Sequence, residues 1–183
     1  MKRSIFLMAA IVVVVMSGSS FGQGFEPTDA HKVLNHEVGT WTAKGKVWQP
    51  GADEPMEFEG TETNRIIGGM WVVSDFKGDF GGMKFEGHAM MGYDMDGKKY
   101  VGMWFDSMSP YPSKMSGSYD AEKKTMTFNT VNKNPETGDE YKGKNVIVYK
   151  DKDTRVMTMY MDMDGKMVKS MELVYTRKKS ASK

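Results

Sequence analysis

The sequence predicts an all-β protein, a single up-and-down antiparallel β-barrel of about eight to ten strands with a short N-terminal helix. Ten stretches rich in aromatic, β-branched and methionine residues follow one another from residue 40 to residue 177. Turn-forming residues separate these stretches at regular intervals, and no helix-like stretch interrupts them. Short sequential connections favour a meander, and closing a sheet of this size removes its exposed edges.

Residues 1–22 are predicted to be a cleaved signal peptide. Lys2 and Arg3 precede an apolar run over residues 5–16, which is too short for a good transmembrane span, and small residues precede position 23. We therefore expect a periplasmic or secreted protein. The chain has no cysteine, so we expect no disulfide, no lipid anchor and no stable membrane anchor after cleavage. An uncleaved membrane anchor is the alternative.

The remaining chain is predicted to form one domain. Residues 23–38 form an N-terminal segment with a short helix at about 27–37, which Thr28 or Asp29 caps and Gly39 ends. Residues 39–177 form the barrel, and residues 178–183 form a solvated basic tail. We expect strands at about 40–49, 56–67, 69–77, 83–93, 98–107, 113–119, 124–132, 140–150, 154–162 and 166–177.

The hairpin over residues 83–107 carries the strongest turn signal, an Asp-Gly between two alternating runs. A three-residue loop, Met95 to Gly97, would place Asp94 opposite Lys98. One face would then be uniformly apolar, and the other would be aromatic and polar. The same five residues, Asp-Met-Asp-Gly-Lys, recur at 162–166, and we expect the same turn there. The expected pairs are Met91 with Val101, His88 with Trp104, Glu86 with Asp106, Met161 with Met167 and Met157 with Met171.

The aromatic and polar face of this hairpin supplies the candidate chemistry. Glu86, His88 and Asp106 would lie close enough for one carboxyl group to perturb the other and for His88 to act as a base. The alternative is that this face is simply the solvated outside of the sheet. His31 and His36 are expected to be surface residues. The candidate ligand-binding residues are Glu86, His88, Trp104, Asp106, Arg65 and Trp71.

Methionine is unusually common, with 19 residues in the chain, whereas Leu34 and Leu173 are the only leucines after residue 22. Methionine therefore serves as the general apolar filler, and its flexible thioether suits an adaptable cavity wall. The alternative, functional interpretation is that these methionines bind Cu(I), because thioethers are soft ligands. The candidate copper ligands alternate along one strand and are Met157, Met159, Met161 and Met163.

The tripeptide from Gly39 to Trp41 resembles the Gly-x-Trp signature of lipocalins and related calycin barrels. That resemblance implies that Trp41 packs at the closed end of the barrel under a basic residue of the last strand, and Arg177 is in a position to match. A wider pattern over residues 31–177 resembles a family of exported bacterial proteins known only as domain of unknown function 1579. Its marks are Gly39, Trp41, Gly45, Glu62, Asn64, Arg65, Gly68, Gly69, Gly92, Tyr93, Asp94, Trp104, Asp106, Ser107 and Gly117.

The resemblance implies a fold and no assigned activity. A haem-binding barrel of the nitrobindin type, which also begins with Gly-Thr-Trp, needs a histidine late in the chain, and no histidine follows His88. We therefore expect no cofactor. The net charge of +1 gives no reason to expect a nucleic-acid partner.

We predict that the barrel binds a small, largely apolar molecule. A hydrolase or isomerase that uses Glu86, His88 and Asp106 is the alternative, and a periplasmic copper carrier is the second alternative. The sequence leaves the ligand and the oligomeric state open.

Overall fold

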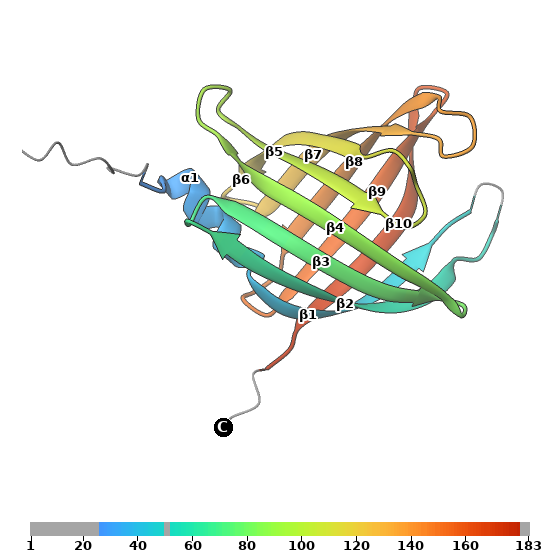
Figure 1. The fold of residues 1–183 in the computed structure, drawn as a ribbon, viewed down its shortest axis with the longest axis horizontal. Helices are drawn as coiled ribbons and strands as arrows, with labels where there is room; N and C mark the ends of the chain where they lie inside the picture. The colour runs from blue at the N-terminus through green and yellow to red at the C-terminus, as the bar shows by residue number, and fades with distance from the viewer. Residues whose placement is uncertain (1–25, 50–51, 180–183) are drawn as a thin grey trace, which may run out of the picture.

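The computed structural model describes residues 26–49 and 52–179 (Figure 1). The predicted signal peptide, residues 1–22, lies outside the described residues. One short helical segment is followed by ten strands. In the part of the chain that the structure describes, no helix is long and apolar enough to cross a membrane.

The ten strands close into one antiparallel barrel (Figure 1). Each strand pairs with its neighbours in the sequence, and β1 also pairs with β10, with Trp41 opposite Arg177. The predicted up-and-down antiparallel barrel with a short N-terminal helix is therefore confirmed. The strands are β1 (Gly39–Val47), β2 (Met56–Ile67), β3 (Trp71–Phe80), β4 (Met83–Asp94), β5 (Lys99–Asp106), β6 (Ser113–Asp120), β7 (Thr125–Lys133), β8 (Glu140–Tyr149), β9 (Thr154–Met163) and β10 (Lys166–Arg177).

The helical segment covers one end of the barrel, which we call the closed end. It consists of α1 (Asp29–Lys32) and the 3-10 turn η1 (Val33–His36) (Figure 1, blue). Leu34 is fully buried in the core of the barrel. The prediction that His31 lies at the surface is wrong: it is buried beside Tyr93, with 5.6 Å between ring centroids. The segment lies across the end of the barrel, so the side of α1 that carries His31 faces the interior.

Side chains along each strand alternate between the interior and the outer surface. Inward side chains near the closed end form a core cluster that contains Leu34, Val72, Met91, Tyr100, Met126, Phe128, Ile147 and Tyr149. A second cluster lies along β1–β3 and β10 and contains Trp41, Ala43, Phe58, Phe76, Leu173 and Tyr175.

The register predicted for the 83–107 hairpin is wrong by one residue. Asp94 pairs with Lys99, so the loop contains four residues and not three. The Asp94 carboxylate accepts the backbone N–H groups of Asp96 and Gly97, and the left-handed residue of the loop is Lys98, with φ 48°. The aspartate therefore organises a turn whose left-handed position falls one residue after the glycine.

This shift exchanges the two faces of β5 relative to β4. Ala89 pairs with Trp104, and Gly87 pairs with Asp106. All four residues lie on the inner face of the sheet. His88 pairs with Phe105 on the outer surface. The predicted face that combined Glu86 and His88 with Trp104 and Asp106 therefore does not exist.

The repeated sequence at 162–166 forms a different turn from the first copy. Met163 pairs with Lys166, and Asp164 and Gly165 form a two-residue loop with positive φ values of 55° and 82°. Such a loop has the backbone signs of a type I′ hairpin turn. The expected pairs were again wrong: Met161 pairs with Val168, one residue beyond the expected Met167. Met157 pairs with Leu173, two residues beyond the expected Met171, because a register shift between Lys169 and Met171 adds a further residue.

Candidate ligand-binding site

The inner face of the barrel at the end opposite the helical segment, which we call the open end, is the candidate site. Phe85, Trp104 and Met159 point inward there and are only half-buried. Inward side chains near the closed end, such as Met126 and Phe128, are fully buried. The interior is therefore filled at one end and accessible to solvent at the other, and barrels of eight or more strands have room for a small ligand.

Strands β2–β5 present an aromatic wall, formed by Phe58, Phe76, Phe80, Phe85 and Trp104. The rings of Phe58 and Phe80 stack with 4.1 Å between centroids, and Phe80 meets Phe85 edge-on at 5.2 Å. Phe85 stacks on Trp104 at 6.3 Å, with 16° between the ring planes. These contacts make one continuous apolar surface, and aromatic side chains bury large areas in exchange for little conformational entropy.

Glycines on neighbouring strands allow these rings to lie flat against the strands. A Cβ atom at Gly87 would overlap the indole of Trp104, and a Cβ atom at Gly45 would overlap the ring of Phe58. With glycine at these positions, the rings rest on the backbone instead of crossing the interior.

Methionines line other parts of the interior and form what we call the methionine wall: Met115 of β6, which is next to β5, Met157, Met159 and Met161 of β9, and Met171 of β10. Met159 and Met171 are direct cross-strand partners. All five side chains are half-buried. Methionine is flexible and polarisable, so this wall adapts to the shape of an apolar molecule and favours contact with aromatic rings.

Polar side chains occupy the inner face of β5–β7 near the open end. The Trp104 indole N–H donates to Asp106 Oδ2 at 2.7 Å. The Ser113 hydroxyl donates to Asn132 Oδ1 at 2.5 Å, and Asn132 Nδ2 donates to Thr130 Oγ1 at 2.9 Å. The site thus combines two apolar walls with a short row of hydrogen-bonding groups, the usual composition of a small-molecule pocket.

Two predicted site residues, Glu86 and His88, lie on the outer surface. Glu86 is ion-paired with Lys77 at 3.1 Å, and His88 Nδ1 lies 2.6 Å from Asp75 Oδ1. Asp106 lies on the inner face, so the sheet separates it from both. The predicted catalytic trio of Glu86, His88 and Asp106 is therefore not assembled, because the one-residue register shift places its members on opposite faces.

The structure also places the remaining candidates. Arg65 is exposed at an outward position of β2, and Trp71 covers Gly92 on the outer surface with 37 % of its area exposed. Three of the four candidate copper ligands belong to the methionine wall, and Met163 is exposed at the end of β9. Copper binding by these methionines stays a prediction.

The sequence analysis missed most of the aromatic wall. Phe58, Phe76 and Phe80 were assigned to strands but not to a site. The signal that identifies them is a glycine directly across from or beside an aromatic residue on the next strand, as with Gly45 opposite Phe58. That signal becomes readable only once strand pairing is known.

A buried ionic network holds the closed end together, and the sequence analysis missed it as well. Arg155 of β9, which is 4 % exposed, forms ion pairs with Glu37 and Glu62, the latter with 2.5 Å between Nη2 and Oε1. Asn64 Nδ2 donates to Glu62 Oε1 at 2.6 Å and to the Glu37 carbonyl at 2.9 Å. Glu37 directly follows η1, so the network ties the helical segment to β2 and β9.

Burial shifts the ionisation of this network. Burial raises the pKa of the Glu62 carboxyl, although hydrogen bonds from Asn64 and Tyr175 oppose this effect. Burial also lowers the pKa of Arg155 to about 10, so its guanidinium remains charged at neutral pH. One cation thus serves two buried carboxyl groups, and its loss would leave them without compensation.

Trp41 lies between this network and the last strand. It is 1 % exposed, and its indole N–H donates to the Glu37 carbonyl at 2.8 Å. The guanidinium carbons of Arg177 and Arg155 lie 3.9 Å and 4.6 Å from the centre of the ring. Arg177 also bonds to the carbonyl of Val38, which holds the start of β1 against the end of β10.

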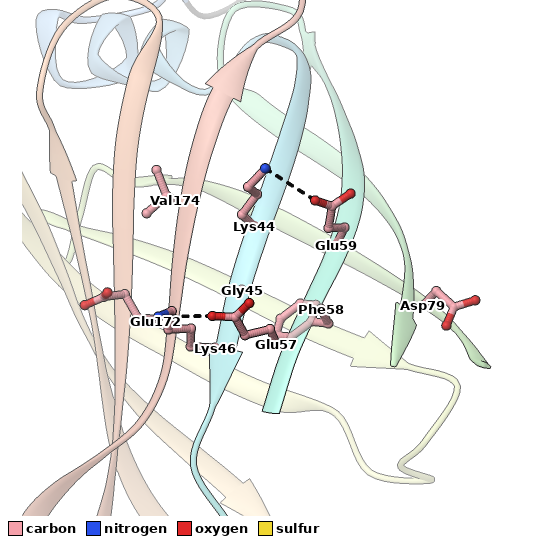
Figure 2. Close-up of a pocket in the computed structure, with 9 residues that line it drawn as sticks. All are labelled: Lys44, Gly45, Lys46, Glu57, Phe58, Glu59, Asp79, Glu172 and Val174. Carbon is pink, nitrogen blue, oxygen red and sulfur yellow. Dashed lines mark ion pairs between the residues drawn. The ribbon is translucent and has the colours of Figure 1, made fainter. Parts of the chain in front are cut away.

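A hollow of about 490 Å³ on the outer side of β10, β1 and β2 is a second surface feature (Figure 2). Its charged side chains pair with each other: Lys44 with Glu59 at 3.5 Å, and Lys46 with Glu57 at 3.1 Å. These side chains are half or more exposed, so each ion pair contributes little to stability. The interior, which is lined by half-buried aromatic and methionine side chains, is the better candidate for a binding site.

Comparison with known structures supports the fold. A crystal structure of Rv2717c from M. tuberculosis matches with a TM-score of 0.62 and 12% identity, and covers 84% of this chain and 99% of that chain. An S-type phycobiliprotein lyase, CPES from Guillardia theta, matches with a TM-score of 0.57 and 14% identity, over 81% of this chain and 92% of that chain. At such identities the likeness shows the barrel fold alone.

No curated protein matches the sequence. A family model described as a protein of unknown function, DUF1579, matches residues 26–177, which include the helical segment and all ten strands. This chain therefore belongs to the DUF1579 family and adopts a calycin-like barrel.

Proposed function

We propose that this protein binds a small, largely apolar molecule in the open half of its barrel. The observation that carries the proposal is the pair of apolar walls: the aromatic wall on β2–β5, in which Phe80, Phe85 and Trp104 are only half-buried, and the half-buried methionine wall on β6, β9 and β10. In a closed barrel of this strand order, the methionines of β9 lie across the interior from the aromatic wall, and Met115 of β6 lies next to it. A molecule between them removes apolar surface from water on both sides, at about 25 cal/mol per Å².

The chemistry of the inner face favours binding over catalysis. In the described strands, the buried charged groups of the interior lie at the closed end, where Arg155 pairs with Glu37 and Glu62. The only histidine on a strand, His88, faces outward. The phycobiliprotein lyase named above has the same fold, which is compatible with ligand binding by this chain, but the proposal depends on the walls.

Two glycine substitutions test whether the ligand lies inside. Gly87→Ala forces the indole of Trp104 away from the strand and into the interior, whereas Gly92→Ala displaces Trp71 on the outer surface. Because the displaced indole would occupy space that the probe fills, we expect Gly87→Ala to weaken binding of the neutral probe pyrenemethanol by roughly tenfold, which corresponds to about 1.4 kcal/mol. Gly92→Ala is the matched control and leaves the affinity unchanged.

Isothermal titration calorimetry of the parent protein and the two variants measures these affinities. Equal affinities for the parent and Gly87→Ala, with weaker binding by Gly92→Ala, would move the site to the outer surface. A parent protein that binds no apolar probe would contradict the proposed function itself.

A further inference from the structure

Asp106 is fixed at the polar edge of the proposed site by hydrogen bonds from two different groups. Its Oδ2 atom accepts the Trp104 indole N–H at 2.7 Å, and its Oδ1 atom accepts the Met108 backbone N–H at 2.8 Å. Each carboxylate oxygen retains a further lone pair, because an ionised carboxylate offers about four acceptor positions. The Asp106 carboxylate is thus held in place and can still accept hydrogen bonds from a ligand.

Asp106 forms no ion pair with any residue that the structure describes: no lysine, arginine or histidine nitrogen among them forms a salt bridge with its carboxylate. The other acidic groups on the inner face of the described strands and their closed end, Glu37 and Glu62, both pair with Arg155. Asp106 is the inward-facing carboxylate that remains available to a ligand.

The groups around Asp106 suit a cation rather than a neutral donor. Trp104 lies beside the carboxylate, and its ring is part of the aromatic wall through the stack with Phe85. The hydrogen bond places the carboxylate at the edge of the indole ring, so a cation bound there lies next to a ring system whose faces attract cations. Tyr141 of β8, the strand partner of Asn132, also lies on the inner face. Burial and, to a lesser degree, the charge of Asp106 raise its pKa, so its hydroxyl remains neutral.

We infer that the ligand carries a positively charged nitrogen, an ammonium or amidinium group, which Asp106 and Trp104 hold while its apolar body lies between the aromatic and methionine walls. This inference rests on the proposed function, because it assigns the polar end of the molecule that the walls would bind. It names a class of ligand, cationic amphiphilic molecules, and one residue that sets specificity.

Three probes with the same apolar body test the inference: pyrenemethylammonium, pyrenemethanol and pyrenecarboxylate. We expect the parent protein to bind the ammonium probe at least about tenfold more tightly than the alcohol, and the carboxylate most weakly, because charge-assisted hydrogen bonds are the stronger ones. Asp106→Asn removes this preference and leaves the affinity for the alcohol within about twofold of the parent value, because the apolar contacts are unchanged.

Glu86→Gln is the matched control, because it also removes one negative charge, next to Gly87 and across the sheet from Asp106. We expect this variant to keep the full preference for the ammonium probe. Circular dichroism checks that each variant is folded. Asp106→Ser is the second variant, since a serine hydroxyl also has the lone pairs to accept the Met108 N–H.

The outcomes separate the inference from the proposed function. Equal affinity of the parent for all three probes, or a preference that survives in both Asp106 variants, overturns the role of Asp106 but leaves apolar binding in place. A preference lost equally in Glu86→Gln shows a general charge effect and also overturns it. No binding of any probe overturns both.

Discussion

Replacing Trp41 with alanine is expected to lower the free energy of unfolding by about 3–5 kcal/mol, the range for large-to-small changes of buried tryptophans. Trp41 is 1 % exposed, its N–H bonds to the Glu37 carbonyl, and it lies between the guanidinium groups of Arg155 and Arg177. The variant loses the apolar contacts, the hydrogen bond and two cation–π contacts together. Urea denaturation followed by circular dichroism measures the loss.

Trp71→Ala is the control for this prediction, because Trp71 is 37 % exposed on the outer surface. We expect this change to cost less than about 1 kcal/mol. The affinity of folded Trp41→Ala for pyrenemethanol should match that of the parent, since Trp41 lies at the closed end. A loss of less than about 1 kcal/mol for Trp41→Ala would contradict its structural role.

Replacing Arg155 with methionine is expected to lower the free energy of unfolding at neutral pH by about 3–5 kcal/mol. Arg155 is 4 % exposed and pairs with both Glu37 and Glu62, so methionine leaves two buried carboxyl groups without their cation. The helical segment then loses a connection to β2 and β9. Denaturation of the purified variant at neutral pH measures the effect.

The double variant Arg155→Met with Glu62→Gln distinguishes lost charge compensation from lost packing. Removing one carboxyl group from the network should restore at least about 1 kcal/mol, because the two positions are in direct contact and their effects are not additive. If Glu62→Gln instead adds its own loss to that of Arg155→Met, uncompensated charge is not the cause. Arg155→Met with parental stability would show that the network contributes nothing.

The number and order of the strands are readable from the sequence because they depend on local signals. Ten alternating runs were expected, and ten strands form in one closed sheet. Turn residues also mark both copies of the Asp-Met-Asp-Gly-Lys segment correctly as hairpin ends. Period-two patterning and turn chemistry act over a few residues, so they survive in the sequence without any knowledge of the fold.

The register of a hairpin depends on the length of its loop, and the loop lengths predicted from the sequence were wrong. The same five residues form a four-residue loop after Asp94 and a two-residue loop after Met163. The choice between loops depends on how the flanking strands pair with the rest of the barrel, which is tertiary information. A shift of one residue moved Trp104 and Asp106 from the side of Glu86 and His88 to the interior.

The ionic network around Arg155 and the packing around Trp41 both depend on contacts between residues far apart in the sequence. Glu37, Glu62 and Arg155 come together only when β2 and β9 meet the segment after η1. Each residue alone looks like an ordinary charged position on a strand or a helix end. Gly39 and Trp41 were identified because they belong to a short contiguous signature, whereas the partners of Trp41 are spread over the whole chain.

Methyl NMR of the methionine side chains tests most directly whether a ligand occupies the open half of the barrel. The inner face carries Met115, Met157, Met159, Met161 and Met171, and the outer surface carries the cross-strand pair Met90 and Met103, which are 47 % and 39 % exposed. On addition of pyrenemethanol, we predict large shifts of the five inner methyl signals from the aromatic ring current and no shift of Met90 or Met103. Shifts confined to Met90 and Met103, with the inner signals unchanged, would contradict binding in the barrel.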